Sequence, residues 1–152
     1  MTVESDFHGT FTPRLDDKGR LFIPARYRED FRAGLVMTTG QEGCIYLFPV
    51  AEFRTISRAM AQVPSSAANV RAMVRMFRAN ATPEEAPDRQ GRITVPATLR
   101  TWAGLDRDCA VLGNGNRLEI WAADRWATYQ DEHAEGYATY SQGSEEVVIP
   151  GL

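Results

Sequence analysis

The chain has 152 residues, of which 43% are hydrophobic, and its formal net charge is −3. This length is sufficient for one compact core or for two small lobes that share an interface, and no window approaches the roughly 18 consecutive apolar residues of a membrane span. The acidic balance excludes an indiscriminate nucleic-acid binder, which usually has a strongly basic domain, and the lack of a charged-then-apolar signal region leads us to expect a cytoplasmic protein.

The first predicted elements are a turn, a strand and a helix between residues 16 and 34. Asp16 opens a tight turn, since an aspartate accepts hydrogen bonds from the backbone that follows it, and Gly19 accepts a positive φ. Residues 21–23 form a short β-favouring run that the following proline ends by removing a backbone donor. A short helix should follow, with Gly34 at its end.

A hairpin and two helices are predicted next. Residues 35–37 and 45–48 are β-favouring runs on either side of a glycine-containing connection, and a helix begins near Pro49. Asn69 is a suitable N-cap for the second helix. One face of that helix carries apolar residues with helical periodicity, namely Val70, Met73, Val74 and Phe77. The opposite face carries Arg71, Arg75 and Arg78, which we interpret as a solvated helix face.

The second half of the chain repeats the first series. Residues 81–87 contain two prolines and are expected to form a connector or an irregular edge strand. Asp88 and Gly91 then open a turn that leads into a strand at residues 93–95. The next elements are a helix that ends at Gly104, a hairpin formed by residues 110–112 and 118–121, and a final helix from Ala122.

The amino-acid sequence contains an internal repeat. Residues 16–25 align without a gap to residues 88–97, and six positions are identical when Arg28 and Arg100, just downstream, are included. The similarity continues into the hairpin strands of each half, so it does not arise by chance. Matching turns alone would explain part of the motif, and the repeat therefore establishes architecture more firmly than function.

The cysteines and histidines do not form a metal-binding pattern. Cys44 and Cys109 are isolated, so we interpret each as a small buried hydrophobe. His8 and His133 lie at no metal-ligand spacing from each other or from a cysteine, so neither a metal nor a cofactor is expected. Phe48, Trp121 and Trp126 could form a surface through which copies of the chain associate. Their alternating or helical placement favours positions in the core instead.

Two Asp-x-x-Gly-Arg turns, each leading through a short strand into Pro-Ala, resemble the paired half-domains of the MraZ family, which is related to the AbrB-type DNA-binding fold. The resemblance implies an α+β fold in which two tandem AbrB-like half-domains form a swapped-hairpin β-barrel with peripheral helices. We expect a first repeat at 7–60, a connecting helix at 61–80, a second repeat at 81–135 and an acidic tail at 136–152.

The resemblance also implies a function. It predicts a transcriptional regulator, acting as a repressor, that associates with the nucleoid as a ring-shaped homo-oligomer. Its partner would be double-stranded promoter DNA, with short direct repeats ahead of the division and cell-wall gene cluster. No membrane partner and no small-molecule substrate are expected.

The candidate site residues belong to the two turns. The resemblance implies DNA contacts at Arg20 and Arg92. The chemistry of arginine agrees with this role, because a guanidinium presents a planar fork of donors that suits guanine O6 and N7. Other basic side chains beside the turns would position phosphates, namely Arg14, Lys18 and Arg89. The residues that build the turns and orient the arginines are Asp16, Gly19, Asp88 and Gly91. Because Gln90 stands where the first turn has Lys18, the first copy is expected to lead recognition.

Two other classes of function compete with this interpretation. Asp16 and Asp17 are adjacent on a turn, where side chains usually point apart, and no nucleophile, general base or phosphate-cradling loop accompanies them, so an enzyme is not expected. A protein-interaction or antitoxin-like module built on the same fold stays open, because a fold does not determine a function.

Overall fold

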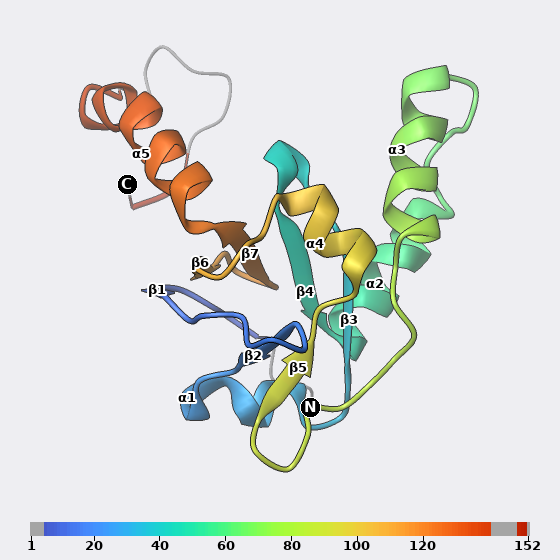
Figure 1. Ribbon diagram of the computed structural model, residues 1–152. Coiled ribbons are helices and arrows are strands. Elements are labelled where there is room, and N and C mark those ends of the chain that lie inside the picture. Colours follow the sequence, from blue (N-terminus) through green and yellow to red (C-terminus); the bar gives the residue numbers. More distant parts are fainter. Residues whose placement is uncertain (1–4, 141–148, 152) are drawn as a thin grey trace.

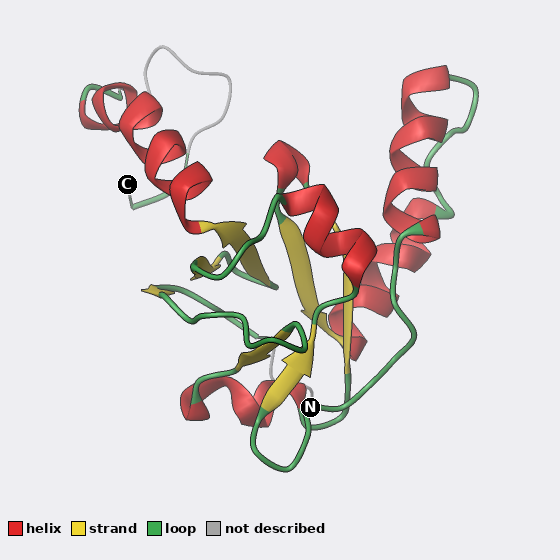
Figure 2. Ribbon diagram, viewed as in Figure 1, coloured by secondary structure: helices red, strands yellow, loops and turns green. Residues whose placement is uncertain are grey.

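The computed structural model describes residues 5–140 and 149–151. Its strands lie in the interior, and the helices lie around them (Figure 2). Helix α5 (Ala123–Ala138) projects from one side of the molecule, whereas α2 (Val50–Met60) and α3 (Ala68–Ala79) lie on the other side (Figure 1). Most of the predicted acidic tail lies outside the described residues.

The main sheet has five strands in the order β1-β6-β7-β4-β3. Its members are β1 (Thr10–Phe11), β3 (Leu35–Thr39), β4 (Ile45–Pro49), β6 (Cys109–Gly113) and β7 (Leu118–Ala122). Strands β3 and β4 form one antiparallel hairpin, and β6 and β7 form the other, as the sequence predicts. The hairpins join through β4 and β7, where Ile45 pairs with Ile120, so both halves of the chain share one sheet.

A separate two-stranded ribbon consists of β2 (Arg20–Phe22) and β5 (Arg92–Thr94), which pair in antiparallel register. Leu21 lies opposite Ile93, and both are buried in the main core. Since successive side chains of a strand point to opposite faces, the other residues of the ribbon face away from the core.

The two halves are interleaved through the segments that precede their turns. Strand β1 pairs with β6 of the second half, where Thr10 lies opposite Leu112. In return, Glu85 of the second half forms a bridge with Leu35 in β3, with backbone hydrogen bonds of 2.7 and 3.2 Å. The predicted connector at 81–87 therefore acts as an irregular edge strand.

An α+β fold is confirmed, but the expected closed barrel is not present within residues 5–140 and 149–151. The five-stranded sheet ends at β1 and β3, and the β2–β5 ribbon pairs only with itself. The segments that could close the barrel offer few backbone donors, because Pro13, Pro83 and Pro87 have no N–H. Pairing of these segments is limited to the two residues of β1 and to isolated bridges, which join Phe7 to Gly115, Arg14 to Asp108 and Leu35 to Glu85.

The shorter helices are α1 (Ala25–Arg28), the 3-10 helices η1 (Glu29–Phe31) and η2 (Gln41–Gly43), and α4 (Ala97–Ala103). Gly104 ends α4 in the left-handed conformation with φ 61°, as predicted. The predicted N-cap at Asn69 is wrong. Helix α3 begins at Ala68, with an extended Ala67 before it. Arg71 donates to the carbonyls of Ser65 and Ser66 at 2.8 and 3.0 Å, which holds the preceding segment so that the helix can begin before Asn69.

Buried apolar side chains from both halves form one core between the ribbon, the sheet and the short helices. Cys44 and Cys109 are buried, which confirms their assignment as small hydrophobes, and burial raises the pKa of both thiols, that of Cys109 to about 11. Phe48 and Trp121 are also buried. Trp126 is half-buried and packs against Trp121 with ring centroids 5.2 Å apart, so these aromatics belong mainly to the interior.

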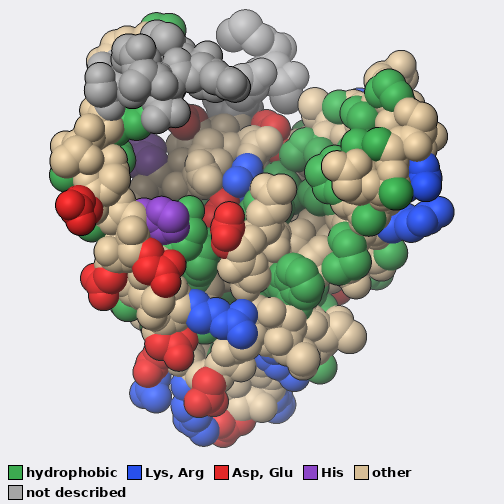
Figure 3. Space-filling view, turned by 90° about the horizontal axis from the view of Figure 1, so that it is seen from above, with side chains coloured by type: hydrophobic (Ala, Val, Ile, Leu, Met, Phe, Trp, Pro, Cys, Tyr) green, Lys and Arg blue, Asp and Glu red, His purple; other side chains and the backbone are tan. Residues whose placement is uncertain are grey.

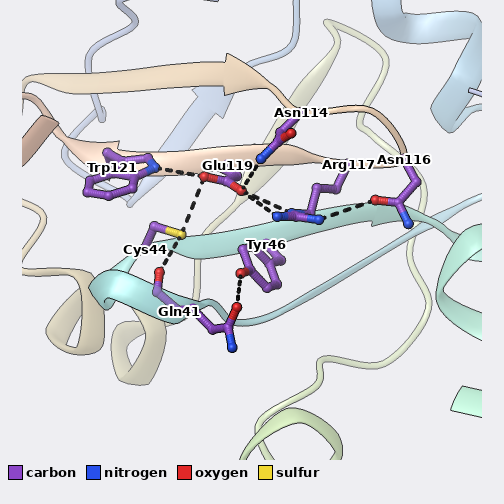
Figure 4. A network of polar contacts seen from close by, with 8 residues as sticks. All are labelled: Gln41, Cys44, Tyr46, Asn114, Asn116, Arg117, Glu119 and Trp121. Atoms are coloured by element: carbon purple, nitrogen blue, oxygen red, sulfur yellow. Dashed lines mark hydrogen bonds and ion pairs between the residues drawn. The ribbon is translucent and has the colours of Figure 1, made fainter. Parts of the chain in front are cut away.

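Glu119 is a buried carboxylate that links the two hairpins (Figure 4). Arg117 donates to Oε2 from Nε and Nη2 at 3.0 and 2.8 Å, and Asn114 donates to the same oxygen at 3.1 Å. Oε1 accepts from the Trp121 indole at 3.1 Å and faces the Cys44 thiol at 3.9 Å. A buried carboxylate with this many donors is stabilised in its charged form and fixes the packing around it.

Candidate nucleic-acid interface

The first turn is built around the carboxylate of Asp16. Its Oδ1 accepts hydrogen bonds from the backbone N–H groups of Lys18 and Arg20, both at 2.9 Å, and its Oδ2 accepts from Arg20 Nε at 2.7 Å. Gly19 adopts φ +75°, which an L side chain rarely adopts. One aspartate therefore shapes the turn and orients the arginine that follows it.

The second turn repeats this geometry. Asp88 Oδ1 accepts from the backbone N–H groups of Gln90 and Arg92 at 2.9 Å, Oδ2 accepts from Arg92 Nε at 2.9 Å, and Gly91 adopts φ +78°. The replacement of a lysine by Gln90 leaves the turn intact, because only the backbone N–H at that position takes part.

The hydrogen bonds lower the pKa of both aspartates. For Asp16 the largest cause is the backbone N–H of Arg20, and the guanidinium of the same residue adds to it; Asp88 is affected by Arg92 in the same way. Both turns are therefore built on ionised carboxylates at neutral pH, as the charged form accepts these hydrogen bonds.

Each of the two arginines is held at Nε, which leaves its terminal nitrogens for a ligand. Within residues 5–140 and 149–151, no hydrogen bond or ion pair occupies Nη1 or Nη2 of Arg20 or Arg92. Their side chains are 27% and 22% exposed. An arginine that is positioned in advance loses less conformational entropy when it binds.

The outward face of the ribbon brings both arginines together. Arg20 pairs across the strands with Thr94, and Phe22 pairs with Arg92, so all four side chains share the face opposite Leu21. Phe22 is 55% exposed. Phe22 was not among the predicted site residues. The signal that could have identified it is the alternation along the strand, in which its neighbours Leu21 and Ile23 are both buried.

Each turn is also completed by the other half of the chain. Gly91 accepts a backbone hydrogen bond from Ile23 at 2.8 Å, and Gly19 accepts one from Val95 at 2.8 Å. The guanidinium of Arg28 packs over Gly91 and donates to the Ile23 carbonyl.

Arg100 packs over Gly19 in the corresponding way and donates to the Val95 carbonyl at 2.5 Å. Arg28 and Arg100 are identical positions of the sequence repeat, but the repeat did not indicate that each supports the turn of the other half.

The remaining predicted site residues differ in their surroundings. Arg14 is exposed and forms an ion pair with Asp108 at 3.0 Å. Lys18 and Arg89 are exposed on their turns, and neither side chain has an ion-pair partner in the part of the chain that the structure describes. Asp17 pairs with Arg107 at 3.1 Å. Lys18 and Arg89 therefore lie on the exposed surfaces of the two turns, whereas Arg14 lies beside the carboxylate of Asp108.

The described residues contain no group of three or more His, Cys, Asp or Glu side chains that could hold a metal ion. Among them there is also no helix with the length and apolar character needed to cross a membrane.

Comparison with known proteins identifies the family. The model for the MraZ protein, whose description includes the term antitoxin-like, matches residues 7–76 and 77–144. Three relatives are named transcriptional regulator MraZ: those of Thermobifida fusca, Frankia alni and Saccharopolyspora erythraea, at 49%, 51% and 51% identity. Each alignment spans 146 residues, 96% of this chain and 99% of the relative. The chain belongs to the MraZ family.

The family assignment agrees with the internal repeat. Each of the two MraZ matches contains one Asp-x-x-Gly-Arg turn, one strand of the ribbon and one hairpin of the main sheet. The resemblance inferred from the sequence is confirmed, and MraZ relatives are named as regulators of transcription rather than as enzymes.

Proposed function

We propose that this protein is a sequence-specific regulator of transcription that binds double-stranded DNA through the outward face of the β2–β5 ribbon. The observation that carries the proposal is the arrangement of Arg20 and Arg92. Both lie on one exposed face, and each is held by its own aspartate with its terminal nitrogens free. Such a guanidinium is suited to the O6 and N7 acceptors of guanine.

The dimensions of the ribbon fit the DNA major groove. The groove is about 12 Å wide and admits a two-stranded β-ribbon. Arg20 and Arg92 occupy diagonal positions in the ladder, which places them roughly 7–8 Å apart. That separation corresponds to about two base-pair steps of about 3.4 Å each, so the two arginines would contact nearby positions of one site. The exposed ring of Phe22, which lies directly opposite Arg92 and two positions along β2 from Arg20, would contact a thymine methyl group.

The family resemblance supports a more specific proposal. The DNA target would be short direct repeats in the promoter of the division and cell-wall gene cluster, and bound protein would repress transcription there. The interleaved pairing of β1 with β6 and of Glu85 with Leu35 would be the counterpart, within one chain, of a hairpin swap between subunits. Localisation at the nucleoid follows from the same proposal.

We also propose that copies of the chain associate in a ring, with α5 of one copy against the α2–α3 side of the next. An apolar groove of about 670 Å³ lies on that side. It is lined mainly by Ile56, Met60, Met73, Met76, Phe77 and Trp102. Hydrophobic side chains gather on the right of Figure 3, where α3 lies, and basic side chains flank them. An exposed apolar surface of this kind is typical of an interaction site.

The charges of the helices favour a second copy as the partner. Helices α2 and α3 contain five arginines and only one acidic residue, Glu52, whereas α5 contains four acidic residues and one arginine. Opposite charges on two different faces of the same chain favour head-to-tail contacts, which close into a ring when the rotation permits. Several ribbons at a fixed spacing would then engage successive direct repeats.

The DNA proposal is tested by selecting preferred duplexes from a random library with the purified protein. Binding of the selected duplex and of a scrambled duplex is then compared by gel shift at two salt concentrations. Arg20→Ala and Arg92→Ala should each reduce discrimination about 10- to 100-fold, the value of one bidentate base contact. Arg20→Lys keeps the charge but loses the fork, so it should also lose discrimination. Arg26→Ala, at an exposed arginine that lies neither on the ribbon nor on α2 or α3, is the control and should bind as the unaltered protein does.

Two results would overturn the DNA proposal. One is a selection that yields no enriched sequence. The other is an Arg20→Ala variant that stays folded and discriminates as well as the unaltered protein.

The association proposal has a separate test. Replacing Met73 and Met76 together with glutamate should convert the oligomer into monomers, as measured by light scattering after gel filtration. Ala72→Glu introduces a charge on the same helix outside the groove and should leave the mass unchanged. An unchanged mass for the Met73/Met76 variant would show that the groove does not hold a second copy.

A further inference from the structure

The two halves of the chain jointly form a small basic pocket beside the second turn. Arg28 and Arg32 come from the segment that follows β2, and Arg89 comes from the second turn itself. The pocket has a volume of about 220 Å³, and its walls include Pro87 and Gly91. The close packing of Arg28 over Gly91, which has no side chain, brings the first-half arginines up to the turn.

The positive charge of this pocket is only partly compensated. The carboxylate of Asp88 is already held by Arg92, and Arg28 uses Nε to donate to a backbone carbonyl. Arg32 contacts Glu29 at 3.2 Å, but both side chains are more than 70% exposed, so water weakens this pair. Within the described residues, no carboxylate forms an ion pair with Arg28 or Arg89.

The first turn differs in this respect. Asp17 occupies the position that Arg89 occupies in the second turn, and it forms an ion pair with Arg107. Gly104 occupies the position equivalent to Arg32, so the first turn lacks that guanidinium as well. The matching folds of the two turns therefore have different charges, and the second turn has two more arginines beside it than the first turn has at the equivalent positions.

We infer that Arg28, Arg32 and Arg89 form a binding site for a DNA backbone phosphate beside the second turn. The inference rests on the proposed function and extends it with two residues, Arg28 and Arg32, that lie outside the Asp-x-x-Gly-Arg motifs. Guanidinium groups bind phosphate oxygens through charge-assisted hydrogen bonds. A phosphate held here would position the duplex so that the adjacent Arg92 can read a base, since phosphate contacts set register and base contacts set specificity.

This site assigns the turns different tasks. The sequence predicts that the first copy leads recognition, because it carries Lys18 where the second copy has Gln90. The pocket instead assigns the main phosphate contact to the second copy, whereas both Arg20 and Arg92 stay base-reading candidates.

The test compares salt dependence in matched variants. The variant Arg32→Gln/Arg89→Gln removes two exposed charges of the pocket and leaves Arg28, which also supports the turn, in place. The logarithm of the binding constant is measured against the logarithm of salt concentration for the selected and the scrambled duplexes. Loss of one phosphate contact in each bound copy should make the slope less steep by about 0.9 per copy on the duplex. Affinity for both duplexes should fall by the same factor. Arg26→Gln, which removes an exposed arginine outside the pocket and outside the ribbon, is the control and should leave the slope unchanged.

The outcomes separate this inference from the proposed function. If no duplex is selected from the library, the proposed function fails. If a duplex is selected but the double variant keeps the original slope, or if Arg26→Gln changes the slope as much as the double variant does, the phosphate site is overturned. A change in the ratio between selected and scrambled duplexes would also overturn it, because it would indicate base reading. Circular dichroism and the oligomer mass establish that each variant is folded and assembled.

Discussion

Replacing Gly91 with alanine probes the support that one half of the chain provides to the turn of the other. Gly91 has φ +78°, and an L residue in that conformation costs about 1–2 kcal/mol. The new Cβ would lie 2.6 Å from Cζ of Arg28, so the guanidinium must move away. Its 3.0 Å hydrogen bond to the Ile23 carbonyl would then be lost, at a cost of about 1.5–3 kcal/mol for a charged donor. We expect the free energy of unfolding to fall by about 3 kcal/mol.

Two other glycines separate these contributions. Gly115 has φ +73° with open space around it, so Gly115→Ala should cost only the backbone strain of about 1–2 kcal/mol. Gly136 lies within α5, also in open space, and Gly136→Ala should increase stability by about 0.5–1 kcal/mol. Urea unfolding followed by tryptophan fluorescence measures all three variants. One protein concentration must be used, because association itself adds stability.

The contact between the halves is refuted if Gly91→Ala is no more destabilising than Gly115→Ala. A second refuting result is strict additivity of Gly91→Ala and Arg28→Ala. If the guanidinium and the new methyl group compete for the same space, the double variant must lose less stability than the sum of the two single variants.

Three further predictions concern titration, reactivity and the buried carboxylate. The hydrogen bonds that Asp16 accepts lower its pKa from 3.8. The charged carboxylate therefore stabilises the folded protein above about pH 4, and this stability is lost as the pH falls through the lowered pKa. Midpoints of urea unfolding between about pH 5 and 2.5 should depend less on pH in Asp16→Asn than in the unaltered protein. Burial raises the pKa of Cys109 to about 11 and also raises that of Cys44. At about pH 8 the native thiols should therefore react with an aromatic disulfide only as fast as the protein opens, and a prompt reaction would contradict their burial. Glu119→Ala leaves Arg117 without its carboxylate and should lower the free energy of unfolding by about 3 kcal/mol, with discrimination between duplexes unchanged in the folded fraction; a selective loss of discrimination would show that the network serves binding.

Much of the local structure could be predicted because the interactions that form it lie close together in the chain. The turns at Asp16 and Asp88 depend on hydrogen bonds that span at most four residues. Runs of β-favouring residues on either side of glycine-containing connections identified the hairpin strands. The cap at Asn69 was mispredicted because a contact from Arg71 to the preceding segment decided where α3 begins.

The sequence by itself determined the repeat, the two aspartate-centred turns and the arginine that each aspartate orients. Only the tertiary structure decided that β2 pairs with β5, so that Arg20, Phe22 and Arg92 share one face. It also decided that Arg28 reaches the turn of the other half. The physical reason is range: a turn is stabilised by groups a few residues apart, whereas the ribbon and the basic pocket depend on packing between segments whose contact cannot be read from either segment alone.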